Sequence, residues 1–274
     1  MNGAVRVGAG RRVAVIGDVG GHLDALGAEL ARLGVASGGP LPPDLVVIQV
    51  GDLIHRGPDS EGVVSLVDGY LRSQPDQWVQ LVGNHEAQYL REPAFHWPER
   101  IARESMDTLR RWWASGQMRA AVALESSKES YLVTHAGLTE PFWRRTLSAP
   151  EDAADAADRI NRLIGHDDDT LFRAGILVGR DAEAGPVWAS ACAELVPSWL
   201  DRRLPFSQVH GHTSITDWEN SRFRTETRAG VLTVLDEAAK HETTTLTGGR
   251  IVGVDPGHGD RAQPVWRAWE APEK

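Results

Sequence analysis

The sequence predicts an α/β protein whose ligand-binding loops gather at one edge of a β-sheet. Two observations lead to this prediction. Apolar, β-branched runs alternate with helix-like segments through the first third of the chain, which is typical of a sheet with helices on its faces. Several of these runs end directly at a short polar motif, and open α/β sheets bind ligands at the carboxyl ends of their strands.

The first third of the chain carries the clearest elements. Residues 13–17, 44–50 and 77–82 are predicted strands, because each is an apolar run bounded by turn residues. Residues 23–33 and 60–71 have apolar side chains at helical spacing and are predicted helices between those strands. Together these segments predict a β-α-β-α-β unit.

The middle block, about residues 95–200, is predicted to be helical and to cover or flank the site within one domain that includes the whole chain. A helix is expected over 99–115, and Ser148 with Glu151 resembles a capping box that opens a helix reaching Ile164. Further strands are predicted over 131–134, 206–209 and 250–254, with a hairpin through Ala229-Gly230 between 223–227 and 231–235.

The composition disfavours several classes of partner. A net charge of −9 lacks the basic excess that a nucleic-acid backbone requires. The single cysteine, Cys192, cannot form an internal disulfide and fits a reducing compartment. No apolar run approaches the length of a membrane span. We therefore expect a cytoplasmic protein that binds neither a membrane nor nucleic acid through bulk electrostatics.

Polar motifs follow five of the predicted strands. Asp18, Asp52 and Asn84 follow the first three strands in turn, and His135 and His212 follow two later ones. Carboxylate, amide and imidazole groups are ligands for Mn, Fe or Zn in proteins. Polar groups at separate strand ends have no structural reason to converge without an ion. The pattern therefore predicts a metal site.

These motifs resemble, in order, those of the calcineurin-like metallophosphoesterase superfamily, in particular its bacterial phosphoprotein-phosphatase type. The resemblance covers residues 13 to about 213 and implies central mixed β-sheets, packed as a sandwich, with flanking helices and a helical middle insertion. It also implies hydrolysis of phosphate esters by a metal-bound hydroxide at a two-metal site. The motifs are Gly17-Asp18-Val19-Gly20-Gly21-His22, Gly51 to Gly57, Gly83-Asn84-His85-Glu86, His135-Ala136-Gly137 and Gly211-His212-Thr213.

The resemblance assigns a role to each motif residue. Asp52 would bridge the two metals, and the ligand set is rich in oxygen without a thiolate, which favours Mn over Fe or Zn. Arg56 would hold the substrate phosphate together with Asn84, and His85 would be the general acid that protonates the leaving alkoxide. The implied metal ligands are Asp18, His22, Asp52, Asn84, His135 and His212.

Two positions depart from the family pattern. The histidine expected two residues after Asp18 is replaced by Gly20, so His22 either reaches the first metal instead or merely starts the following helix. His55 stands where the family usually has an aspartate that orients the acid histidine. A neutral imidazole can accept a hydrogen bond, but it stabilises an imidazolium less than a carboxylate does. We therefore expect a lower pKa for His85 than in related proteins, a different orienting partner, or an acid role shared with His55.

Several polar residues outside these roles have alternative readings. The resemblance implies a second phosphate-binding arginine after a Pro-x-Trp-like run, and this chain has none after Pro186-Val187-Trp188. Arg173 or Arg180 could substitute for it. The missing arginine favours a small substrate. His210 is either near the metals or structural. For His258 a solvated turn is favoured over the site mouth, and the run at 167–169 is expected to be a solvated acidic loop.

Three functions remain open on the sequence. The first is a phosphatase for Ser/Thr phosphoproteins or small phosphomonoesters. The second is hydrolysis of a dinucleoside polyphosphate or phosphodiester, because the His135-Ala136-Gly137-Leu138 run resembles such hydrolases. The third is a catalytically weakened phosphate-binding or regulatory protein, suggested by Gly20 and His55.

Overall fold

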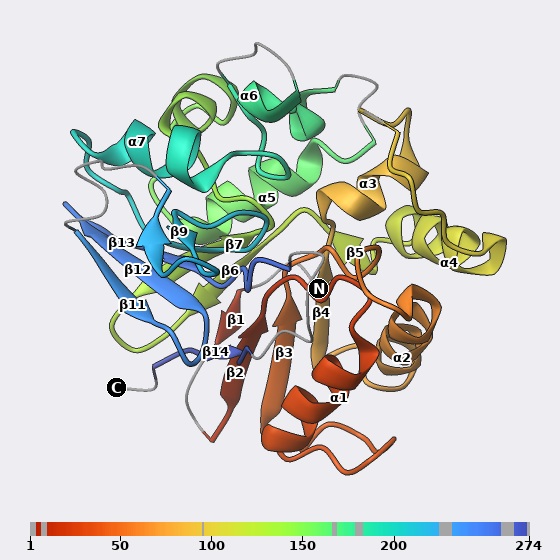
Figure 1. The fold of residues 1–274 in the computed structure, drawn as a ribbon. Coiled ribbons are helices and arrows are strands. Elements are labelled where there is room, and N and C mark those ends of the chain that lie inside the picture. The colour runs from red at the N-terminus through yellow and green to blue at the C-terminus, as the bar shows by residue number, and fades with distance from the viewer. Residues whose placement is uncertain are drawn as a thin grey trace.

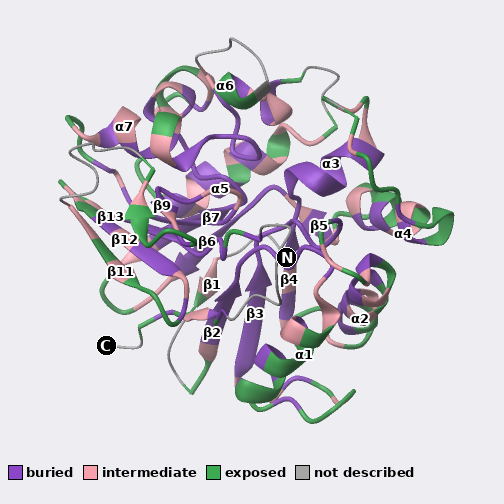
Figure 2. Cartoon of the chain, viewed as in Figure 1, coloured by how far each residue is buried: buried purple, intermediate pink, exposed green. Residues whose placement is uncertain are grey.

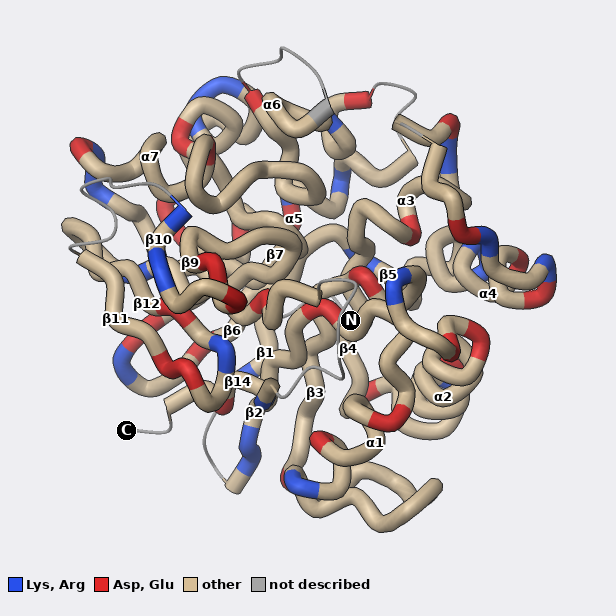
Figure 3. The backbone as a smooth tube through the Cα atoms, viewed as in Figure 1, with Lys and Arg blue, Asp and Glu red and all other residues tan. Residues whose placement is uncertain are grey.

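Two mixed β-sheets pack face to face, with helices on their outer faces (Figure 1). The structure, a computed structural model, describes residues 4–6, 10–94, 96–165, 169–178, 183–224, 232–258 and 266–272. None of the helices in these ranges has both the length and the apolar character that crossing a bilayer requires. The described Lys and Arg residues are interspersed with Asp and Glu (Figure 3).

The first sheet contains the predicted β-α-β-α-β unit. Its strands run in the order β14-β2-β3-β4-β5, and β2 to β5 are parallel while β14 is antiparallel to β2. The five strands are β14 (Trp269–Glu270), β2 (Arg12–Ile16), β3 (Leu45–Gln49), β4 (Trp78–Leu81) and β5 (Met118–Arg119).

Helices α1 (Leu23–Arg32) and α2 (Ser60–Ser73) connect the first three strands of this unit. Helix α1 ends where Gly34 adopts a φ of 98°, a backbone conformation that suits glycine. Helix α2 begins after Asp59, whose side chain accepts a hydrogen bond from the Gly62 backbone N–H at 2.7 Å. These strand and helix predictions are confirmed to within about two residues at each end.

The second sheet runs in the order β1-β6-β7-β8-β13-β12-β11. Strands β7, β8 and β13 are parallel at its centre, and β12 and β11 extend one edge as an antiparallel hairpin. Its strands are β1 (Val5–Arg6), β6 (Ala121–Glu125), β7 (Ser130–Thr134), β8 (Ser207–His210), β13 (Gly249–Gly253), β12 (His241–Leu246) and β11 (Thr233–Asp236).

Alternation of side chains along each strand divides the core into two layers. In β2, Val13 and Val15 face the other sheet and pack in one cluster with Val133 and Val252 of the second sheet. The intervening Ala14 and Ile16 belong to the cluster under the helices. Both sheets are therefore buried on both faces at their centres, as the purple strands of Figure 2 show.

Residues 95–200 contain helices and also three strands. The helical elements are α4 (Arg103–Ala114), η1 (Phe142–Thr146), α5 (Ala153–Arg162), η2 (Thr170–Phe172), α6 (Gly175–Val178), η3 (Ala191–Leu195) and α7 (Val196–Trp199). The sequence interpretation missed β5 and β6, because Ala-rich runs such as 121–125 carry no helix or strand period that distinguishes them.

Two local predictions were wrong. Helix α5 begins after Asp152, whose side chain accepts the Asp155 backbone N–H at 2.7 Å, whereas Ser148 has a φ of 56° and lies outside the helix. The hairpin predicted between 223–227 and 231–235 is also incorrect in its pairing. Strand β11 pairs with β12, and β10 (Arg222–Phe223) pairs with β9 (Thr216–Asp217). The turn at Ala229-Gly230 lies outside the described residues.

Candidate metal and active site

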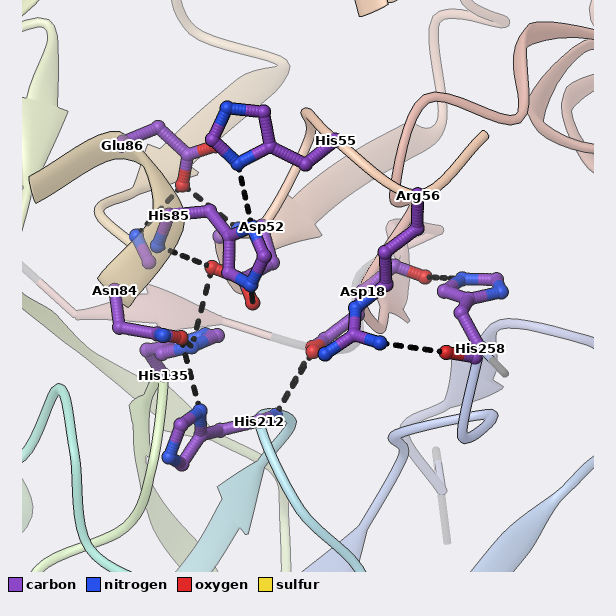
Figure 4. Close-up of polar contacts among 12 residues, drawn as sticks. Asp18, Asp52, His55, Arg56, Asn84, His85, Glu86, His135, His212 and His258 are labelled. Atoms are coloured by element: carbon purple, nitrogen blue, oxygen red, sulfur yellow. Dashed lines mark hydrogen bonds and ion pairs between the residues drawn. The ribbon is translucent and has the colours of Figure 1, made fainter. Parts of the chain in front are cut away.

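Five loops meet where parallel strands of the two sheets end. Asp18 follows β2, Asp52 follows β3, and Asn84 begins helix α3 (Asn84–Leu90) directly after β4. His135 and His212 come from the other sheet, after β7 and β8. Figure 4 shows the side chains of these residues pointing toward one another.

Four hydrogen-bond acceptors surround the end of the Asn84 side chain. The ligand atoms of Asp52, His135 and His212 all lie within 4.8 Å of one another. The Asn84 Oδ1 position is 3.0 Å from His135 Nε2 and 2.9 Å from His212 Nδ1. The same position is 3.2 and 3.1 Å from the two carboxylate oxygens of Asp52. Even with the amide reversed, two N–H bonds cannot satisfy four acceptors, whereas one cation can.

The imidazoles at this cluster are in the form that binds metals. His135 Nδ1 lies 3.0 Å from the Val50 carbonyl oxygen and donates to it, so the lone pair of Nε2 faces the cluster. Burial, reinforced by His135, lowers the pKa of His212 to about 3, and burial also lowers the pKa of His135. Metals bind neutral imidazole, and these residues therefore fit a divalent ion.

Asp18 adds a second carboxylate beside this cluster. Its two oxygens accept the His212 backbone N–H at 3.0 and 3.2 Å. Burial and the nearby carboxylates of Asp255 and Asp52 raise the pKa of Asp18 well above its ordinary value. Buried carboxylates that face one another repel unless a proton or a cation lies among them, so this side of the site also fits a cation.

The structure places His258, not His22, in the cavity wall beside Asp18. The ring of His22 lies 4.9 Å from that of His258, and His22 is not among the described residues that line the cavity. His258 is 8% exposed, and its Nε2 donates to the Asp18 carbonyl oxygen at 2.6 Å. The interpretation of His258 as a solvated turn was therefore wrong.

Gly20 explains how His258 reaches this position. A Cβ added at Gly20, which has a φ of 53°, would lie 3.1 Å from His258 Cδ2. A histidine at position 20 would thus compete with His258 for space. The first motif has no histidine two residues after Asp18, and His258, which is distant in sequence, places an imidazole beside Asp18.

Glu86 holds the second and third motifs together. Its carboxylate accepts three backbone N–H groups, from Asp52 at 2.8 Å, Leu53 at 2.9 Å and Gly83 at 2.9 Å. The two loops approach so closely that a Cβ at Gly83 would lie 2.2 Å from the Asp52 nitrogen. No role was predicted for Glu86, although it is the last residue of the Gly83-Asn84-His85-Glu86 motif.

Backbone strain concentrates at the site. Asp52, His55, Arg56 and His212 have φ values of 55°, 71°, 66° and 65°, in the left-handed region that side chains other than glycine rarely adopt. Such conformations each cost about 1–3 kcal/mol and persist where surrounding contacts impose them. Three of these four residues, Asp52, Arg56 and His212, line one cavity.

His85 and Arg56 face the same cavity as the metal cluster. His85 Nε2 lies 3.7 Å from Asp52 Oδ2, and burial lowers the pKa of His85 from its ordinary value. Arg56 donates from Nη1 to the His258 carbonyl oxygen at 3.1 Å, and its guanidinium lies 5.1 Å from the ring centre of Trp97. An imidazole and a guanidinium therefore lie in the same cavity wall as the cluster.

The cavity has a volume of about 680 Å³ and includes a second arginine, Arg224. Arg173 is elsewhere, paired with Glu183 at 3.1 Å, and Arg180 lies outside the described residues. Sequence reasoning missed Arg224 because it follows β10 with no motif around it. Only the return of the β9–β10 segment to the site brings it into the wall.

The remaining histidine and acidic candidates lie away from the cavity. His210 is buried, its Nδ1 lies 2.9 Å from the Gly211 carbonyl oxygen, and it is absent from the described cavity wall. Asp169 forms an ion pair with Arg91, while Asp167 and Asp168 lie outside the described residues.

The two-sheet sandwich and the buried cluster of carboxylate, amide and imidazole groups beside an arginine fit the metallophosphoesterases, enzymes that hydrolyse phosphoric esters. The chain belongs to the calcineurin-like phosphoesterase family, whose family model matches residues 11–215.

Solved structures support the same fold. A cold-active protein-tyrosine phosphatase of a psychrophilic Shewanella species is 17% identical, with a TM-score of 0.54 over 90% of this chain and 72% of that one. A protein serine/threonine phosphatase from Saccharomyces cerevisiae is 16% identical, with a TM-score of 0.51 over 94% of this chain and 72% of that one.

One curated relative matches over a short segment. A zinc-dependent endopolyphosphatase of Saccharomyces cerevisiae is 39% identical over 71 residues. That segment is 26% of this chain and 19% of the relative, so the match spans about a fifth of the other protein.

Proposed function

We propose that this protein is a two-metal phosphomonoesterase that acts on small phosphorylated molecules. The observation that supports this most directly is the convergence of four acceptor atoms on one point, with His85 and Arg56 in the same cavity. Asp52, Asn84, His135 and His212 would hold one ion, and Asp18 with Asp52 the other. Mn remains the proposed metal, because three of the five proposed ligands, Asp18, Asp52 and Asn84, are oxygen donors and none is a thiolate. The cytoplasmic location stays a prediction from the single cysteine.

Bound divalent ions would supply charge neutralisation and a water that is deprotonated near neutral pH. Residues of the chain would bind the phosphate and protonate the leaving group. Arg56 binds two phosphate oxygens through its planar fork, and its contact with the His258 carbonyl limits where that fork lies. His85 directs Nε2 into the cavity and donates a proton to the leaving oxygen.

The shape and charge of the cavity favour a small substrate. Its volume is in the range of small-molecule sites, and its described wall contains two arginines, Arg56 and Arg224. Arg224 is proposed as the second phosphate contact that the sequence lacked after Trp188. Asp217 and Glu219 in the same wall disfavour an acidic phosphopeptide.

Hydrolysis of a phosphoric anhydride, such as a dinucleoside polyphosphate, is the second candidate. Two observations favour it. Arg224 adds a second positive charge to the described wall beyond Arg56, as a chain of phosphates requires. The relative matched over 71 residues is an endopolyphosphatase. Product analysis with a phosphomonoester and a dinucleoside tetraphosphate would separate the two.

Titration of the metal-stripped protein with Mn²⁺ tests the proposal. We expect hydrolysis of an aryl phosphate to rise steeply with the second bound equivalent, because nucleophile and phosphate charge are handled by different ions. Bound metal per chain would be counted in the same samples. Full activity with one ion bound would contradict the two-metal assignment, and no activity with two bound would leave a phosphate-binding protein.

Two variants test which histidine, His22 or His258, supports the proposed metal site at Asp18. We expect His22→Ala to leave the metal count unchanged, because His22 does not line the cavity. His258→Ala removes the hydrogen bond that holds the Asp18 carbonyl and should weaken one of the two Mn²⁺ sites by about 10–100-fold. Calorimetric titration measures both. Loss of one equivalent in His22→Ala alone would restore His22 as a ligand, as the sequence suggested.

A further inference from the structure

Three side chains behind the metal cluster form a continuous hydrogen-bonded chain. His55 Nδ1 lies 2.7 Å from His85 Nδ1, and His55 Nε2 lies 2.7 Å from the Tyr89 hydroxyl oxygen. His85 and Tyr89 are four residues apart on α3, so they lie on one face of the helix, and His55 bridges them. Figure 4 shows the His55 and His85 rings joined in this way.

The direction of this chain follows from its inner end. A histidine that gives up a proton as a general acid is the imidazolium, with protons on both ring nitrogens, because a neutral ring would be left as an imidazolate. The Nδ1–H of His85 then donates to His55 Nδ1. His55, which accepts at Nδ1, carries its own proton on Nε2 and donates it to the Tyr89 hydroxyl oxygen. The other ring nitrogen of His85, Nε2, faces Asp52 and the cavity.

Burial keeps the chain intact. His55, His85 and Tyr89 are 1%, 3% and 5% exposed, so water does not compete for their nitrogens and oxygen. Trp97 stacks on His55 with ring centres 5.7 Å apart and meets the edge of His85 at 4.4 Å. Burial, followed by the influence of His85, lowers the pKa of His55 to about 3, and a neutral His55 is what this directional chain requires.

We propose that Tyr89 is a positioning residue: by accepting from His55 Nε2–H it fixes the His55 tautomer whose Nδ1 accepts from His85, and this aims His85 Nε2–H at the leaving-group oxygen. This inference rests on the proposed phosphoesterase function and deepens it. Where a carboxylate would orient the acid histidine by charge, this chain orients it by a neutral imidazole whose own direction is set by a buried phenol. His55, for which the sequence left open a share in the acid role, is on this proposal the middle of an orienting relay.

The variant Tyr89→Phe tests the relay in the full-length protein. It removes one hydroxyl and keeps the ring. We expect kcat on phenyl phosphate, whose leaving group needs a proton, to fall about tenfold, a fraction of what a general acid contributes. The fall on 2,4-dinitrophenyl phosphate should be much smaller, since its leaving group departs without a proton. KM and bound metal should not change.

Tyr70→Phe is the matched control. Tyr70 is also buried, 6% exposed, and its hydroxyl donates to the Gly39 carbonyl at 3.2 Å, away from the cavity. It should leave both substrates unaffected. An equal fall on both substrates in Tyr89→Phe would show a merely structural role and overturn the proposal, as would no fall on either. A second test is Tyr89→Phe in a His85→Ala background, where it should have no further effect.

Nitrogen-15 NMR of the histidine rings provides a readout that does not need activity. In the wild type we expect the His55 proton on Nε2, and in Tyr89→Phe a mixture of His55 tautomers. If the wild type hydrolyses no phosphate ester, the proposed function fails while the His55 tautomer is still measurable. A wild-type His55 protonated on Nδ1 alone would overturn the relay whatever the substrate.

Discussion

Asp52→Ala is expected to abolish both metal binding and turnover, with kcat/KM reduced about a thousandfold or more, equivalent to roughly 4 kcal/mol of transition-state stabilisation. Asp52 contacts three other residues of the proposed site. Its carboxylate lies 3.4 Å from His135 Nε2, accepts the His85 backbone N–H at 3.0 Å, and lies within 3.2 Å of the Asn84 amide. No other described carboxylate forms part of the converging metal-type cluster.

The measurement combines steady-state kinetics on an aryl phosphate with counted Mn²⁺ per chain. Asp52→Asn keeps the size and shape of the side chain, so the protein should stay folded. Its affinity for the second ion should fall. Asp107→Ala, an exposed change on α4, is the control and should behave as the wild type. Near-wild-type activity in Asp52→Ala would remove Asp52 from the site and with it the proposed mechanism.

Glu86→Ala is expected to lower the free energy of unfolding by about 3–5 kcal/mol, because it leaves three buried backbone N–H groups without an acceptor. Glu86 has no exposed surface, so water does not replace the carboxylate. Activity should fall as well, because the strained backbone at Asp52 depends on these bonds.

Graded variants separate hydrogen bonding from volume. Glu86→Gln keeps one oxygen acceptor but sets an amide N–H₂ against at least one backbone donor, so we expect a loss of about 2 kcal/mol. Glu92→Ala, an exposed glutamate just beyond α3, serves as the control. Urea unfolding of the metal-free proteins measures all three. A loss below about 1 kcal/mol in Glu86→Ala would mean that the loops hold their shape without it.

Much of the fold follows from local patterns in the chain. Strands β2, β3 and β4 are short apolar runs, and α1 and α2 have apolar side chains at helical spacing between turn signals, so each element is defined by neighbouring residues. The proposed metal ligands also follow a local pattern, because Asp18, Asp52 and Asn84 lie within three residues of the ends of those strands. The start of α5 and the strand β6 were missed where two local signals competed or none was specific.

The sequence by itself determined the elements, the family and the chemistry of the ligands; the tertiary structure decided which distant residues complete the site. His258 reaches Asp18 across 240 residues, and Arg224 enters the wall from a small hairpin outside every motif. Tyr89 meets His55 only because α3 docks against the second motif. Strand and helix patterns depend on interactions over a few residues, whereas these contacts depend on how whole sheets and loops pack, which no local spacing encodes.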